Sequence, residues 1–330
     1  MTDLAFGVGL FPTAPLLAIV RLARVTEELG FSHAWIGDSH LIWREAYVTL
    51  AAAALATTRL TLGTGVTNLV TRHPAVVASA LATLHEACPD RVILGLGLGD
   101  SAVETMGRKP SRLDVFARDV RRVRDLLAGR DVETETGTLR LKHAAGEGIR
   151  IYVAASGPRL LALAGRIADG VIVLVGIVPE RVRQAVDTVR AGAREAGRDP
   201  DSLDLVLWVP CAVGDAAAAR AAVKAHVARV LNRPLPFDLD AEEQRVVAEI
   251  RASYDYYQHM ERGASQARVV PDWLVERFAL AGAPDTCRAA VERLRGTGIG
   301  QVAIVPYGTD DGGREATMRA FAAALLGDGA

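Results

Sequence analysis

Short apolar runs alternate along this chain with longer segments in which apolar residues recur at every third or fourth position. Residues 4–11 form the first run and have the character of a buried strand. Residues 15–30 show the helical period and end at Gly30, a natural helix stop. The same pattern predicts further strands at residues 33–37, 59–62, 91–97, 149–155, 170–175, 203–213 and 301–306.

Segments with the helical period fill the intervals between these strands. They predict helices at residues 45–57, 75–87, 112–127, 159–168, 180–196, 215–231, 286–295 and 313–326. Strands and helices joined by short connections build a parallel sheet with right-handed crossovers. Eight such units predict an α/β fold, the (β/α)8 TIM barrel, as a single domain over residues 1–330. A doubly wound open sheet is the alternative, and the strand count favours the barrel.

Two insertions interrupt this alternation. Residues 131–143 alternate polar and apolar positions around Gly137, which predicts a surface hairpin. Residues 232–270 form a long excursion rich in acidic and aromatic residues, including Tyr254 and His259. Such an excursion is typical of a lid or of a wall of a substrate site, and a peripheral helical pair packed on the barrel or on a partner subunit is the equal alternative.

Composition narrows the class of protein. Half of the 330 residues are hydrophobic, and 38 basic residues nearly balance 39 acidic ones, so neither nucleic-acid binding nor a polybasic membrane anchor is indicated. The cysteines Cys88, Cys211 and Cys287 are far apart and lack metal-ligand spacing. With no secretory signal visible at the start and no apolar run long enough for a bilayer, we expect a cytoplasmic protein.

The most informative stretch is residues 62–74, which joins a short strand to a helix that begins near Pro74. It carries glycines at Gly63 and Gly65 together with polar residues such as Asn68, and it is longer than a simple turn requires. Glycines there would let a flat ligand approach the main chain. An ordinary strand-to-helix loop is the alternative, and the spacing alone does not decide between them.

Other candidate residues follow neighbouring strands. Asp38, His40 and Trp43 come after the second strand, and Asp100 comes after the glycine series that includes Gly97. The carboxyl ends of barrel strands meet at one face, where barrel enzymes keep their chemistry. A histidine beside an aspartate can move protons near neutral pH, although both residue types also serve as caps in loops.

Ala155, Ser156 and Gly157 lead from the fifth strand into a helix. The free amides of a helix N-terminus attract anions, so a phosphate site is one interpretation and an ordinary helix start is the other. The remaining histidines are scattered singly. No Ser-His-Asp order and no metal-ligand cluster stands out in the sequence.

The informative passages, taken together, resemble the luciferase-like family of flavin and deazaflavin oxidoreductases. They lie, in the family's order, at residues 63–68, 71–74, 95–100, 152–158 and 168–170. Within the family the chain most resembles coenzyme F420-dependent enzymes of the methylene-tetrahydromethanopterin reductase type. The resemblance implies a TIM barrel with the flat ring of F420, or of FMN as the alternative, lying in its mouth.

The resemblance also implies roles for individual residues. A non-prolyl cis peptide at the end of the third strand, here Gly65–Val66, would back the ring. Asp38 falls on an acidic residue near the ring, and Asp100 falls where sugar-phosphate dehydrogenases of the family carry a catalytic glutamate. Cofactor contacts are expected from Gly65, Val66, Thr67, Asn68, Gly97, Ala155, Ser156 and Gly157.

The chain departs from the family pattern at several positions. The sugar-phosphate enzymes have a histidine directly after the strand-two aspartate, whereas this chain has Ser39 there and His40 one position later. Their phosphate-binding lysine has no counterpart in residues 174–177, and the acid of the pterin reductase in strand one is replaced by Gly9. A sugar phosphate is therefore disfavoured as substrate, and the proton donor is open.

From the residues and the resemblance we expect an oxidoreductase that moves a hydride between reduced F420 and a small organic substrate. Asp38, His40 and Asp100 are the candidates for proton delivery, and Trp43 for a wall of the substrate pocket. The alternatives are an FMN-dependent monooxygenase and a non-catalytic flavin-binding protein. Residues 47–57 and 75–84 are rich in small apolar residues. The family resemblance implies that these helices build a homodimer, and they could equally pack on the barrel.

Overall fold

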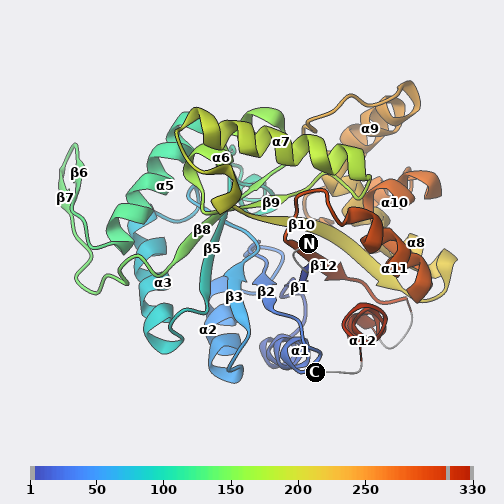
Figure 1. Cartoon of the computed structure of the whole chain (residues 1–330), viewed down its shortest axis with the longest axis horizontal. Coiled ribbons are helices and arrows are strands. Elements are labelled where there is room, and N and C mark those ends of the chain that lie inside the picture. Colours follow the sequence, from blue (N-terminus) through green and yellow to red (C-terminus); the bar gives the residue numbers. More distant parts are fainter. Residues whose placement is uncertain (1–3, 310–312, 328–330) are drawn as a thin grey trace.

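The computed structural model describes residues 4–309 and 313–327, and its centre is a closed ring of eight parallel strands (Figure 1). Each strand pairs with the next in chain order, and the last pairs with both the first and the seventh. The predicted TIM barrel is therefore confirmed and the open sheet is excluded. The ring consists of β1 (Ala5–Leu10), β2 (His33–Ile36), β3 (Thr61–Thr64), β5 (Val92–Gly97), β8 (Arg150–Ala155), β9 (Gly170–Val173), β10 (Asp204–Val213) and β12 (Gln301–Pro306).

A helix follows each of these strands and packs its apolar face on the outside of the ring. The main core lies between these helices and the outward-facing side chains of the strands. The strands are therefore buried on both faces, which is why they carry nearly continuous apolar runs. The helices are α1 (Leu16–Glu28), α2 (Ala46–Ala56), α3 (Pro74–Ala87), α5 (Leu113–Leu127), α6 (Pro158–Ile167), α7 (Pro179–Glu195), α8 (Ala216–Leu231) and α12 (Gly313–Leu325), with α11 (Pro284–Leu294) preceding β12.

The inside of the barrel is filled by large side chains, including Trp35, Tyr152 and Trp208. Glycines on the neighbouring strands make room for them: a Cβ at Gly63 would lie 2.6 Å from the ring of Trp35. The barrel is thus a packed core rather than a pore. Space for a ligand is left at its carboxyl end.

Several connections between the barrel elements contain further helices and strands. β6 (Val132–Thr134) and β7 (Gly137–Leu139) pair as an antiparallel hairpin that extends away from the barrel in Figure 1. The region of the insertion predicted at residues 232–270, together with the residues up to 283, is partly helical. It contains α9 (Ala241–Ser253), η2 (Ser265–Ala267), α10 (Asp272–Phe278) and β11 (Leu280–Gly282), and β11 adds a parallel strand to β10. The short elements β4 (Thr67–Asn68), α4 (Ser101–Glu104) and η1 (Pro200–Ser202) were also not predicted.

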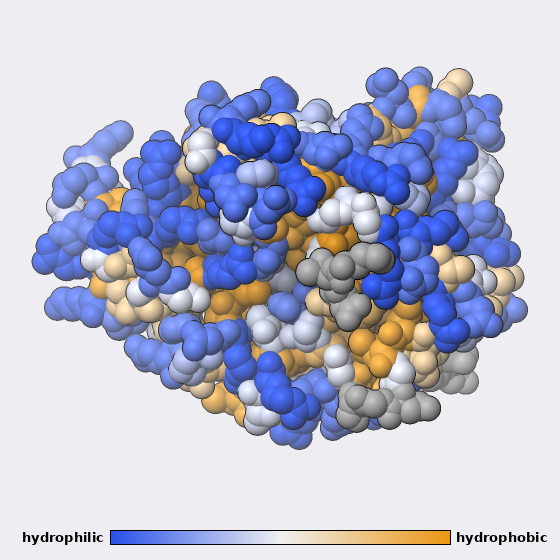
Figure 2. Space-filling model, in the orientation of Figure 1, coloured by the Kyte–Doolittle hydropathy of each residue, from blue (hydrophilic) through white to orange (hydrophobic). Residues whose placement is uncertain are grey.

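The surface is mainly polar. In the face shown in Figure 2, hydrophilic side chains cover most of the outline and hydrophobic ones are visible chiefly in the recessed centre. Among the helices of residues 4–309 and 313–327, none combines the length and the hydropathy needed to cross a membrane.

Candidate active site

A cavity of about 600 Å³ opens at the carboxyl ends of β3, β5, β8 and β9. Its lining comes from the loop after β3, the loop after β5, the N-terminal turns of α5 and α6, and the end of α8. Most of the predicted site residues lie in this lining, namely Asp38, Val66, Thr67, Asn68, Gly97, Asp100, Ala155, Ser156 and Gly157. The structure therefore brings together residues that are far apart in the sequence.

The floor of the cavity is the backbone at Gly65–Val66, which has the cis peptide bond that the resemblance implied. A Cβ at Gly65 would lie 2.7 Å from Cβ of Trp35, so the main chain rests directly on that side chain. Val66 faces Gly97, where a Cβ would lie 3.0 Å from Cγ2 of Val66. The lack of a side chain on Gly97 leaves a flat platform, which we call the shelf, at the height at which a planar ring could lie.

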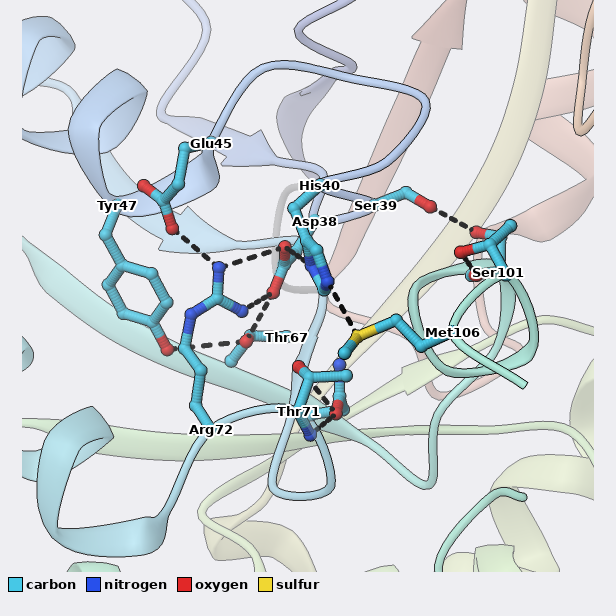
Figure 3. A network of polar contacts seen from close by, with 12 residues as sticks. Asp38, Ser39, His40, Glu45, Tyr47, Thr67, Thr71, Arg72, Ser101 and Met106 are labelled. Carbon is cyan, nitrogen blue, oxygen red and sulfur yellow. Dashed lines mark hydrogen bonds and ion pairs between the residues drawn. The ribbon is translucent and has the colours of Figure 1, made fainter. Parts of the chain in front are cut away.

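Asp38 stands beside the shelf in a network of polar contacts (Figure 3). Its buried carboxylate accepts a hydrogen bond from Thr67 Oγ1 at 2.7 Å and pairs with Arg72 Nη1 at 2.5 Å. The other end of the Arg72 guanidinium pairs with Glu45 at 2.6 Å, and its face lies 4.8 Å from the ring centre of Tyr47. Burial alone would raise the pKa of Asp38, but its polar partners outweigh burial and lower the pKa. Asp38 is therefore a fixed, ionised carboxylate.

His40 lies at the edge of this network rather than in the lining of the cavity. Its Nδ1 is 3.7 Å from Asp38 Oδ1, and its Nε2 is 3.1 Å from the sulfur of Met106 (Figure 3). Ser39 is fully buried and donates a hydrogen bond to Ser101 Oγ at 2.7 Å. His40 can thus reach the cavity through Asp38, and a direct role for it in proton transfer stays a prediction.

Asp100 lines the cavity but is held by two arginines of α8 and its C-terminal end. Arg229 Nη2 lies 2.7 Å from Asp100 Oδ2, and Arg233 pairs with the other oxygen. Burial would raise the pKa of Asp100, but the two guanidinium groups lower it well below its usual range. A carboxylate held in this way is a poor proton donor. Its geometry suits fixing the end of α8 over the cavity, and the catalytic role predicted for it has no direct support.

The far end of the cavity is suited to an anion. Gly157 occupies the position before α6 without a side-chain cap, and Ser156 and Arg159 lie beside it. Ionisable side chains that line the cavity are four arginines and three aspartates: Arg112, Arg159, Arg229, Arg233, Asp38, Asp100 and Asp114. Arg229 and Arg233 pair with Asp100, and Arg112 pairs with Asp114, so the positive charge at this end comes chiefly from Arg159 and the start of α6.

Other predicted residues have different surroundings. The amide oxygen of Asn68 accepts hydrogen bonds from the backbone N–H groups of Val70 and Thr71, so only its nitrogen end is left for a ligand. Trp43 does not belong to the cavity lining. It stacks on Phe11 at 4.6 Å, and its role as a wall of a substrate pocket stays a prediction.

Sequence reasoning missed three residues of the site, Arg72, Arg229 and Arg233. Arg72 stands in the informative stretch, but its partner Asp38 is 34 positions away, and no local pattern connects the two. Arg229 and Arg233 are four positions apart and thus share one face of an alanine-rich segment. Two arginines on an otherwise apolar face are a signal that could have been noticed.

An eight-stranded barrel with its cavity at the carboxyl ends of the strands has the architecture of a TIM-barrel enzyme. The family model described as luciferase-like monooxygenase matches residues 5–301, and the chain belongs to this luciferase-like family. It is 33% identical over 315 residues to 5,10-methylenetetrahydromethanopterin reductase of Methanolobus tindarius, which covers 91% of this chain and 93% of that protein.

Two further relatives carry F420 in their names. The F420-dependent hydroxymycolic acid dehydrogenase of Mycobacterium tuberculosis is 32% identical over 257 residues, or 72% of this chain and 71% of that one. The solved structure of the coenzyme F420-dependent tetrahydromethanopterin reductase from Methanopyrus kandleri superimposes with a TM-score of 0.81. It is 28% identical in sequence, and the match covers 98% of this chain and 99% of that one.

Proposed function

We propose that this protein is an F420-dependent oxidoreductase that transfers a hydride between the deazaflavin and a small organic substrate. One observation carries the proposal: a flat shelf at Gly65–Val66 and a positively charged helix end belong to the same cavity. This combination suits a cofactor with a planar ring and an anionic tail. Relatives that match most of the chain and are named for F420 support it.

The residues that line the cavity fit such a cofactor. Val66 and Gly97 would set the height of the ring, and a larger side chain at Gly97 would fill the place that the ring needs. Ser156, Gly157 and Arg159 would bind the anionic tail at the start of α6. When bound, the deazaflavin supplies the hydride. The protein holds the reacting atoms in contact and excludes water from them.

Asp38 has the role of a fixed negative charge at the ring. As an ionised carboxylate it can accept a hydrogen bond or a proton, but it does not arrive at the site with a proton to give. In the reducing direction the proton for the substrate therefore comes from another group or from solvent. His40, which lies 3.7 Å from Asp38, is the nearest candidate for passing it on.

The test is to titrate the purified protein with F420 and, separately, with FMN, and to monitor binding by fluorescence. We expect saturable binding of F420 and at least tenfold weaker binding of FMN. Tight FMN binding with oxygen uptake in the presence of a flavin reductase would instead indicate a monooxygenase. Tight F420 binding without hydride transfer to a panel of carbonyl, imine and alkene acceptors would indicate a binding protein.

We also propose that the protein is a cytoplasmic homodimer formed through α2 and α3. Large apolar side chains are exposed on these two neighbouring helices, with Leu55 78%, Val48 58% and Val76 58% accessible. The free, buried cysteines suit a reducing compartment. Sedimentation equilibrium should give twice the chain mass, and Leu55→Glu should shift it to the monomer. A monomeric parent protein would refute the dimer.

A further inference from the structure

A second cavity, of about 440 Å³, lies at the amino-terminal end of the barrel, opposite to the shelf. We call it the amino-end cavity. Its walls are the start of β8, the residue before β9, the end of α5 and the segments that follow α5 and α7. Among the described residues, its lining and that of the cavity at the shelf are two separate sets. The ionisable residues of its lining are Arg124, Arg130, Arg150, Arg198, Glu147 and Asp169.

Three of these arginines converge on residues 165–169, where α6 ends and leads into β9. Each donates a hydrogen bond of 2.8 to 3.0 Å to a different backbone carbonyl of this segment: Arg198 to Gly165, Arg124 to Ile167 and Arg150 to Asp169. Carbonyls at the C-terminal end of a helix attract cations. The segment therefore gathers three guanidinium groups at one wall of the amino-end cavity.

The positive charges of this cavity are balanced by carboxylates at every arginine except Arg198. The pairs are Arg124 with Asp169 at 3.0 Å, Arg130 with Asp125 at 2.9 Å and with the exposed Glu147 at 3.6 Å, and Arg150 with Asp204. Within residues 4–309 and 313–327, Arg198 forms no ion pair. The amino-end cavity thus contains one guanidinium whose charge is left over.

Arg198 also has hydrogen-bonding capacity left over. Its Nη1 is used by the carbonyl of Gly165, whereas its Nε and Nη2 have no partner in the described part of the chain and are not sealed in the interior. These two nitrogens form one edge of the guanidinium group, the arrangement that binds two oxygens of a single oxyanion.

The surroundings of Arg198 make its charge unfavourable without a ligand. Burial lowers the pKa of Arg198, Asp169 opposes this shift, and the like charge of Arg124 adds to it. A guanidinium nevertheless stays charged in a protein. Because a partly buried charge without a counter-charge is costly, an anion bound at this edge would remove a cost that the free protein bears.

We propose that the amino-end cavity binds the oxyanion of a small molecule, a phosphate or a carboxylate group, and that Arg198 holds two of its oxygens through Nε and Nη2. The cavity volume is within the range of about 300–1,000 Å³ typical of small-molecule sites, so there is room for the molecule that carries the group. This site goes beyond the proposed function. The ten residues of α6 separate it by about 15 Å from the anion end of the cavity at the shelf, which lies at the start of the same helix.

The test uses the parent protein and labels its arginines with phenylglyoxal in inorganic phosphate, in malonate or in sodium chloride at equal ionic strength, and mass spectrometry of peptides measures each rate. We expect phosphate, malonate or both to slow the modification of Arg198 about fivefold, because the anion covers Nε and Nη2. Arg194, an exposed residue in the last turn of α7, is the internal control and should react equally in all three solutions. The protecting probe identifies the oxyanion, and equal rates at Arg198 in the three solutions would overturn the proposal.

A second measurement separates binding from a purely structural role of Arg198. In Arg198→Met, the rise in melting temperature that the protecting anion produces should fall by about half or more, whereas Arg194→Met, the matched control, should keep the full rise. An unchanged rise in Arg198→Met, with a lower melting temperature in the absence of the anion, would show that Arg198 only caps α6 and would overturn the proposal. Neither measurement involves F420, so failure here leaves the proposed function intact.

Discussion

Replacing Arg72 by methionine tests the energetics of the candidate site most directly. The substitution keeps the length of an apolar stem but removes the guanidinium that pairs with Asp38 at 2.5 Å and with Glu45 at 2.6 Å. The Asp38 carboxylate is fully buried, whereas that of Glu45 is 40% exposed and can turn to water. The loss of stability therefore comes mainly from the unpaired, buried carboxylate of Asp38.

Removing one partner of a buried ion pair typically costs about 3–5 kcal/mol, because the remaining charge is left without compensation. Thr67 still donates to Asp38, so we expect the lower end, about 3 kcal/mol. For a chain of this length, that corresponds to a fall in melting temperature of about 4 °C. Adding Asp38→Asn removes the unpaired charge, so the double variant should recover at least half of the lost stability.

The pH dependence of the free energy of unfolding gives an independent check of this reasoning. In the parent protein the pKa of Asp38 is lowered, so its contribution to stability is present above the pKa of the unfolded chain and is lost as pH falls through the folded-state value. Without Arg72, burial dominates and raises that pKa. The difference in stability between parent and Arg72→Met should therefore shrink from pH 7 to pH 4.5.

The assay is equilibrium denaturation in urea for the parent, the two single variants and the double variant. Additive effects of Arg72→Met and Asp38→Asn would refute the reasoning, because independent sites add and coupled sites do not. So would a loss below about 1 kcal/mol in Arg72→Met, the size expected of an exposed pair.

Three further predictions concern other parts of the molecule. Gly97→Val should place a branched side chain against Val66 and weaken F420 binding at least tenfold in a fluorescence titration. The melting temperature should stay within 2–3 °C of the parent, because the strain is about 1 kcal/mol. Unaltered F420 affinity would mean that the ring does not lie on the shelf. Burial lowers the pKa of His33 to about 4, so the contribution of its neutral form to stability is fully present above pH 6.5 and is lost as pH falls from 6.5 to 4. His33→Gln should therefore flatten the plot of unfolding free energy against pH in this range. An identical slope in the variant would contradict the assignment. Glu243 is buried and pairs with Arg181 and Arg277, so Glu243→Gln should lower the free energy of unfolding by about 2–3 kcal/mol and speed proteolysis in α9. The control is Glu242→Gln at the exposed neighbouring residue. Equal effects of the two substitutions would show that the buried ion pairs do not stabilise α9.

The barrel was predictable because its signals are local. Each strand is a short apolar run, each helix shows its own period, and connections between consecutive elements are short, so the order of the sheet followed from the order of the chain. His73, directly before Pro74, caps α3 by accepting a hydrogen bond from the N–H of Ala75 at 3.2 Å. The position of the shelf came from the family resemblance and not from periodicity.

The parts that were missed depend on contacts between distant residues or on a signal that was passed over. The ion pair between Asp100 and Arg233 could not be predicted, because Arg233 lies 133 positions later and only the folded chain brings the two together. The helix α9 could have been found, because Asp240 and Glu243 form a capping box with the spacing that marks a helix start. The aromatic content of residues 254–260 was noticed, but no pattern in the sequence shows that the ring of His259 lies 5.9 Å from that of Trp43.

The cavity beside the shelf and the segment after α9 come from different parts of the chain. The residues proposed to hold the cofactor come almost entirely from positions 38–160, whereas residues 254–264 form a separate loop whose ends are joined by the hydrogen bond from Ser265 Oγ to the carbonyl of Ser253. Natural variation or engineering can therefore exchange the later segment as a cassette. Such an exchange would leave the residues proposed to hold the cofactor unchanged.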